Sequence, residues 1–142
     1  AFWQSRAEGF FLSIELTGEE MRPLTGLAGA TVLVYGKIPL MVTEQCFYQN
    51  QKGCRPSAQG HRVTLKDRYG TALTACSHCE TCYTVLYEET PLWLGDKPWR
   101  GVRRRLEFTD ETAARVRTIR QAAREQQPLA GTTQGHYTKG VQ

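Results

Sequence analysis

The sequence lacks any apolar run that approaches the roughly 20 residues of a membrane-spanning helix. Its first residues also lack the basic-then-apolar order of a secretory signal. These two absences predict a cytoplasmic protein with no membrane partner. The 142 residues are 40% hydrophobic and 23% charged, a composition that excludes disordered and collagen-like chains and suits one domain.

Familiar catalytic motifs are also missing. The chain has neither the G-x-S-x-G elbow of serine hydrolases nor the H-E-x-x-H motif of zinc peptidases. Its three histidines, His61, His78 and His136, stand apart from one another. A cysteine nucleophile paired with His78 is conceivable, but the neighbouring cysteines would compete as metal ligands. The sequence therefore assigns no catalytic residue.

Five cysteines are the most informative residues that are present. An odd number does not suit a closed set of disulfides, and reduced thiols are more often metal ligands or catalytic groups. They follow the pattern Cys46-x7-Cys54, then Cys76-x2-Cys79-x2-Cys82. Thiolates three residues apart can converge on one centre, so the spacing predicts a zinc or iron–sulfur site. One cysteine is left over, whichever four act as ligands.

Three other roles for these cysteines are less favoured. Buried free cysteines act as small hydrophobic side chains, but these lie in polar, glycine-containing stretches. Disulfides conflict with the odd number and with a reducing compartment. A thioredoxin-like pair needs a helix after its C-x-x-C motif, whereas Cys79-Glu80-Thr81-Cys82 precedes a β-branched segment. The spacing does not separate zinc from iron–sulfur.

The hydrophobic pattern predicts an α/β fold. We expect a β-α-β unit made of a strand at 10–16, a helix capped by Thr17, and a buried parallel strand at 31–35. The polar segment 46–60 is expected to be loop. Further expected elements are a β-hairpin of 61–66 and 71–74, a strand at 83–87, a strand at 105–108, and a helix capped by Thr109 that ends near 126.

These elements divide the chain into four segments of one domain. They are a β-α-β segment at 1–46, a cysteine-rich loop and hairpin at 47–82, a strand and helix at 83–127, and a glycine- and threonine-rich tail at 128–142. The chain opens with a helix-like pattern at Phe2, Trp3, Ala7 and Phe10 and no capping residue. That opening predicts that the chain is part of a longer polypeptide.

A family resemblance begins in the segment 35–46, Tyr35-Gly36-Lys37-Ile38-Pro39-Leu40-Met41-Val42-Thr43-Glu44-Gln45-Cys46. This segment resembles the signature of the U32 peptidases, the collagenase-like peptidase family. The resemblance continues in order through Cys54, 65–70, 78–83, Pro91-Leu92 and 135–141, so that it covers nearly the whole chain. The chain resembles the C-terminal segment of the long family members.

The resemblance implies a fold, a cofactor and an activity. The chain would supply the late β-α units of an incomplete or modified (β/α) barrel, with an inserted β-hairpin and cysteine-rich loops. Better understood relatives hydroxylate RNA bases or the ubiquinone ring, and some hold a [4Fe–4S] cluster on four cysteines. By position in the motifs, the ligands here would be Cys46, Cys54, Cys79 and Cys82, with Cys76 outside the pattern.

The expected function is therefore that of an iron–sulfur protein in RNA base hydroxylation, with the remainder of a larger polypeptide and ribosomal or transfer RNA as partners. The fragment by itself is expected to be inactive, because it lacks most loops of a barrel site. Two alternatives remain open. One is a collagenase-like peptidase, and the other is a structural or binding module that uses the same cysteines for zinc and has no catalysis.

Arginines and tryptophans point to RNA more weakly. The net charge of +4 permits an acidic partner without requiring one. Arginines at 100, 103–105, 115, 117, 120 and 124 could contact phosphates, although a solvated surface is the more ordinary interpretation. Trp3, Trp93 and Trp99 could stack on bases, but tryptophan is more often a core residue.

Overall fold

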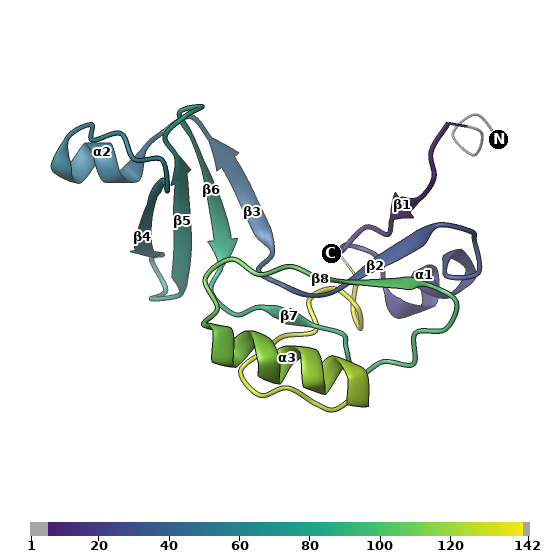
Figure 1. Cartoon of the computed structure of the whole chain (residues 1–142). Helices are drawn as coiled ribbons and strands as arrows, with labels where there is room; N and C mark the ends of the chain where they lie inside the picture. Colours follow the sequence, from purple (N-terminus) through teal and green to yellow (C-terminus); the bar gives the residue numbers. More distant parts are fainter. Residues whose placement is uncertain (1–5, 141–142) are drawn as a thin grey trace. The chain divides into compact units, whose positions relative to one another are not determined.

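The structure, a computed structural model, describes residues 6–140 as two compact units (Figure 1). One unit contains Ala1–Gly36 and Pro91–Gln142, and the other contains Lys37–Thr90. Helices and strands in the described chain form a mixed α/β fold without a closed barrel. The predicted α/β class is confirmed at that level.

The sheet of the first unit is organised around one central strand, β2 (Ala30–Gly36). This strand runs parallel to β1 (Phe10–Phe11) and β8 (Arg103–Leu106), and antiparallel to β7 (Leu92–Trp93). Its residues are buried or half-buried, which fits the β-branched and apolar sequence of a strand in the interior of a sheet. The buried parallel strand predicted at 31–35 is confirmed.

Helix α1 (Gly18–Leu24) connects β1 to β2 and completes the predicted β-α-β unit. Thr17 caps it in a reciprocal arrangement. The Thr17 hydroxyl accepts from the Glu20 backbone N–H at 3.3 Å, and the Glu20 carboxylate accepts from the Thr17 N–H at 2.8 Å. The strand before it is shorter than predicted, because the chain already turns at Ser13, whose carbonyl accepts from the Leu16 N–H.

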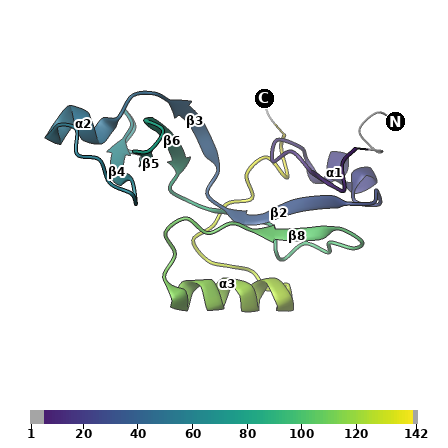
Figure 2. The same cartoon turned by 45° about the horizontal axis from the view of Figure 1, so that its top comes forward.

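Helix α3 (Ala113–Glu125) packs its apolar face on this sheet, on the opposite side of β2 from α1 (Figure 2). The core cluster consists of Tyr35, Trp93, Ile119, Ala122 and Ala123. The Tyr35 hydroxyl donates to Glu111 at 2.7 Å. Burial raises the pKa of Tyr35, so the phenol stays protonated and keeps this hydrogen bond.

Two predicted boundaries in this region are wrong. The cap of α3 is Thr112, whose hydroxyl accepts from the Arg115 N–H at 3.2 Å, and not Thr109, whose N–H donates to the Glu111 carboxylate instead. Strand β8 begins two residues earlier than predicted. Its position is set by parallel pairing with β2, where Thr31 lies opposite Arg103, and not by its own hydrophobic pattern.

The second unit is a four-stranded antiparallel sheet in the order β3-β6-β5-β4 (Figure 1). Its strands are β3 (Pro39–Thr43), β4 (His61–Lys66), β5 (Ala72–His78) and β6 (Tyr83–Glu88). The predicted hairpin and the strand predicted at 83–87 are confirmed. Two elements of this unit were missed, namely β3 and the short helix α2 (Phe47–Lys52), which lies in the segment expected to be loop.

Within residues 6–140, the stretches nearest the two ends of the chain show little regular structure. Phe2 and Trp3 of the predicted helix-like opening lie outside the described residues, while Ala7 and Phe10 are not helical. From 128 to 140 the chain makes a single β-bridge, between Thr133 and Leu92, in agreement with the predicted loop. Within residues 6–140, no helix combines the length and the apolar character required to cross a bilayer.

The corrected cap of α3 can be tested by mutation. Replacing Thr112 by Ala removes the hydroxyl that caps the first turn, so we expect a loss of about 1 kcal/mol in the free energy of unfolding, measured by urea titration. Thr109→Ala is the matched control and should cost less than half as much. An equal or larger loss in the control would place the cap where the sequence predicted it.

The turn of the hairpin predicts a pH dependence. The Asp67 carboxylate accepts from the Tyr69 and Thr71 N–H groups at 2.8 Å each, and hydrogen bonding to Thr71 lowers its pKa most. A lowered folded-state pKa means that this stabilisation is present above the unfolded value of about 3.9 and is lost as the pH falls through the folded value.

Asp67→Asn keeps an acceptor oxygen but no ionisable group. We therefore expect urea unfolding between about pH 5 and 2 to show a shallower loss of stability in Asp67→Asn than in the unmodified chain. Equal slopes in the two proteins would exclude this contribution.

Candidate metal centre

All five cysteines belong to the second unit and are free thiols. Cys46 caps α2 and Cys54 follows the glycine that ends this helix. Cys76 lies on β5, whereas Cys79 and Cys82 lie in the turn that joins β5 to β6. Helix α2 contacts β4 and β5, and these contacts bring Cys46 and Cys54 toward the later cysteines, although they lie far from them in the chain.

Cys46 has the most specific surroundings. Its sulfur accepts from the Gln49 backbone N–H at 3.4 Å and lies 3.7 Å from the Ser77 hydroxyl. The Gln49 N–H lowers the pKa of Cys46 most, desolvation opposes it, and the Ser77 hydroxyl adds a weaker lowering effect. Because the thiolate is the form that binds metals, this environment favours Cys46 as a ligand.

Ser77 is itself held in place by the sheet. Its hydroxyl lies 2.9 Å from that of Thr84, the residue opposite on β6, and both side chains are buried. On the other edge Ser77 lies opposite His61 of β4. Gly60 permits this close pairing, because it has a φ of +69° and a Cβ there would lie 2.2 Å from the Ser77 carbonyl oxygen.

The turn between β5 and β6 is tight. The Cys82 thiol donates to the Cys79 carbonyl at 3.7 Å. Cys82 has a φ of +53°, a left-handed conformation that few residues other than glycine adopt. Such backbone strain is concentrated at functional sites, where the surrounding structure maintains it.

Four of the cysteines line one cavity of about 100 Å³, and they are the four predicted ligands, Cys46, Cys54, Cys79 and Cys82. Two stacked ring pairs complete its wall. Tyr48 stacks on His61 with ring centres 3.7 Å apart, and His78 stacks on Tyr83 with ring centres 4.4 Å apart. All four cysteines therefore border the same small cavity.

The four sulfurs do not converge on one point. Within residues 6–140, no group of three or more histidine, cysteine, aspartate or glutamate side chains is arranged to hold a metal ion. Ligation by all four would draw the exposed Cys54 and Cys82 inward, and coupling of this kind between metal binding and local folding is common. The donor set itself suits zinc or an iron–sulfur cluster. Ligation by these four residues stays a prediction.

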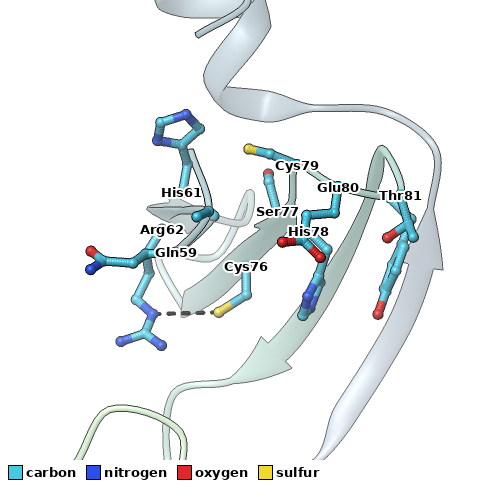
Figure 3. A pocket seen from close by; sticks show the side chains of 12 residues that line it. Gln59, His61, Arg62, Cys76, Ser77, His78, Cys79, Glu80 and Thr81 are labelled. Carbon is cyan, nitrogen blue, oxygen red and sulfur yellow. Dashed lines mark hydrogen bonds between the residues drawn. The ribbon is translucent and has the colours of Figure 1, made fainter. Parts of the chain in front are cut away.

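Cys76 has different surroundings. It lies opposite Arg62 of β4, whose Nε donates to the Cys76 sulfur at 3.4 Å. It is one of the residues that line a wider cleft of about 570 Å³, and it does not line the smaller cavity. Figure 3 shows its sulfur directed toward Arg62 and the Cys79 sulfur at the other end of the cleft. Adjacent strand residues face opposite sides of a sheet, which separates Cys76 from the face where Ser77 meets Cys46.

Several residues of this site carried no signal in the sequence. The pairing of Tyr48 with His61 depends on α2, which has no periodic apolar face and was expected to be loop. Ser77 resembles any polar strand residue until its partners are known. His61 Nε2 lies 2.5 Å from the Arg55 carbonyl and ties the segment after Cys54 to β4, a contact that only the tertiary structure creates.

Comparisons of the chain with protein-family models, with curated proteins and with solved structures find no match. The functional interpretation therefore depends on the residues of this chain and their arrangement, and the U32 resemblance stays a prediction from the motifs.

The ligand set can be tested by five single substitutions. We expect protein prepared anaerobically with iron and sulfide to be brown, with broad absorbance near ~400 nm. Serine at Cys46, Cys54, Cys79 or Cys82 should remove most of the metal and lower stability by several kcal/mol. Cys76→Ser is the matched control and should keep the metal content and the stability of the unmodified chain. Iron, sulfide and zinc analysis measures the first, and thermal unfolding measures the second.

Two outcomes would contradict this assignment. Metal loss in Cys76→Ser with normal content in Cys79→Ser would show that the ligand set is wrong. A colourless protein that holds one equivalent of zinc on the same four cysteines would show that the ligands are right and the cluster is wrong.

Proposed function

We propose that this chain is the C-terminal part of a U32-type iron–sulfur protein that acts in RNA base hydroxylation. The observation that carries the proposal is the cavity shared by Cys46, Cys54, Cys79 and Cys82, the four cysteines that match the family motifs. The fifth cysteine, which falls outside those motifs, does not line this cavity. A cluster bound to the four thiolates would supply electron transfer.

The chain's own residues would prepare this site in distinct ways. The Gln49 N–H and the Ser77 hydroxyl favour the Cys46 thiolate. The stacked rings of His78 and Tyr83 form part of the wall of both the small cavity and the wider cleft. A flat polar group such as a base could approach the thiols along this wall, which supports a role close to the substrate.

The arrangement of strands in the first unit supports the proposal that this chain is part of a (β/α) barrel. In the first unit, β1, β2 and β8 are parallel neighbours, with α1 between β1 and β2 along the chain. Parallel strands joined through helices are the units from which (β/α) barrels are built. We propose that these strands contribute late β-α units to a barrel completed by the remainder of a larger polypeptide, with ribosomal or transfer RNA as its substrate.

A second function, a zinc-stabilised module without catalysis, is favoured by one observation. The cavity is small, about 100 Å³, and a single tetrahedral ion needs less space than a four-iron cluster. The same four cysteines would serve both. By contrast, nothing in the site favours a peptidase, since His78 stacks on Tyr83 and no catalytic motif is present.

The proposed activity can be tested in cells. Deleting the gene that encodes this chain should remove a hydroxylated nucleoside from ribosomal or transfer RNA, detected by mass spectrometry as the loss of one oxygen. Reintroducing the gene with Cys76→Ser should restore the nucleoside, whereas Cys79→Ser should not, because only the second removes a proposed ligand.

Unchanged nucleoside profiles after deletion would overturn the RNA proposal. If the nucleoside profiles are unchanged and the purified protein cleaves collagen-like peptides, the result would favour the peptidase alternative. Restoration by both cysteine variants would separate the activity from the cysteine site.

A further inference from the structure

The first unit contains a second cavity that the proposed metal site does not use. It has a volume of about 300 Å³ and lies between α1, the loop before β8 and the C-terminal segment. Its lining includes the cations Arg22, Lys97 and Arg100 and the aromatic rings of Trp99 and Tyr137. None of the described residues that line it is acidic. The cavity therefore combines positive charge with aromatic surface.

The aromatic wall is held in a defined position. The Trp99 and Tyr137 rings meet edge to face, with centres 5.9 Å apart and planes at 74°. Trp99 Nε1 donates to the Leu94 carbonyl at 2.6 Å, and the Tyr137 carbonyl accepts from the Gly18 N–H at 2.8 Å. Gly18 leaves room for the Tyr137 ring, because a Cβ there would lie 2.4 Å from it. Both rings are only half-buried, so each keeps surface for a ligand.

The cations differ in what they contact. Lys97 lies 5.7 Å from the centre of the Tyr137 ring and pairs with Asp96 at 3.2 Å. The Asp96 carboxylate thus offsets part of the charge of Lys97. Arg22 and Arg100 are exposed at the cavity, and guanidinium groups bind phosphate through paired hydrogen bonds. These two arginines are the main candidates for contacts with an anion.

The combination indicates a nucleotide more than a simple anion. Inorganic phosphate or an acidic peptide would need the cations but not the two rings. Proteins that bind single-stranded nucleic acid combine basic residues along the backbone with aromatic rings on which bases stack. The structure also separates the three tryptophans, since Trp93 is buried in the core, Trp3 lies outside the described residues, and Trp99 lines the cavity.

We propose that this cavity binds one nucleotide of single-stranded RNA, with its phosphate on Arg22 and Arg100 and its base against Trp99 or Tyr137. The choice of RNA as ligand rests on the proposed function. The site itself lies entirely in the first unit and requires no metal. It would hold RNA independently of the cysteines, which all lie in the second unit.

Binding can be measured with the full chain as purified and a fluorescein-labelled single-stranded RNA of about 12 nucleotides, by fluorescence anisotropy. Arg22→Gln with Arg100→Gln should weaken binding at least about tenfold. The same pair should reduce the slope of log K against log salt by about 0.7 for each lost phosphate contact. Trp99→Leu should weaken binding by about tenfold and leave the salt slope unchanged, because it removes stacking and no charge.

The matched control removes the same charge from a different surface. Lys66 and Arg68 are exposed at the β4–β5 hairpin, so Lys66→Gln with Arg68→Gln should leave binding within about twofold. Circular dichroism and thermal unfolding check each variant. Because Arg22 and Arg100 are exposed, the first double variant remains informative even if Trp99→Leu does not fold.

Equal losses in the two double variants would show diffuse charge attraction and overturn the proposed site. Heparin binding as tight as RNA binding, with no effect of Trp99→Leu, would reduce the cavity to a general anion site and overturn the nucleotide assignment. These measurements use unmodified RNA and variants outside the cysteine site. Failure here therefore differs from failure of the proposed function, which is judged by the nucleoside profile.

Discussion

The pairing of β5 between β4 and β6 is the constraint on which the cysteine site depends. Its register places Ser77 between His61 and Thr84, and the Ser77 hydroxyl then reaches the sulfur of Cys46. A shift of one residue would exchange the two faces of the strand and bring Cys76 to the side now held by Ser77. The identity of the cysteines that share a cavity is therefore a consequence of strand register.

The cysteine site combines fixed and adjustable parts. Cys46 is fixed at the start of α2 by the Gln49 N–H, and Ser77 is fixed by the sheet. Cys54 and Cys82 are exposed, and both lie on connections between regular elements. Binding of a metal by all four thiols would require Cys54 and Cys82 to move toward Cys46, so metal binding would be coupled to local folding.

The two units provide different kinds of chemistry. The cysteine thiols all lie in the second unit, where they suit a transition metal. In the first unit, the cavity at Trp99 combines guanidinium groups with aromatic rings, which suits phosphate and a base. Under the proposed function, the second unit would supply the reactive centre and the first unit a separate surface that retains the substrate.

The sequence by itself determined the elements whose stabilising partners lie close in the chain. Thr17 and Glu20 cap each other across one turn, Asp67 closes its own hairpin, and the C-x-x-C turn needs no distant contact. The C-x-x-C spacing of Cys76, Cys79 and Cys82 was visible for the same reason.

Only the tertiary structure decided the rest. Strand β3 exposes Leu40 and Val42 and becomes a strand because β6 supplies its hydrogen bonds, and the start of β8 follows from β2. The gathering of Cys46 with Cys82, like the meeting of Trp99 with Tyr137, requires contacts between distant segments. Local patterns do not encode such contacts, because their energy comes from strand pairing and packing that exist only once the chain has folded.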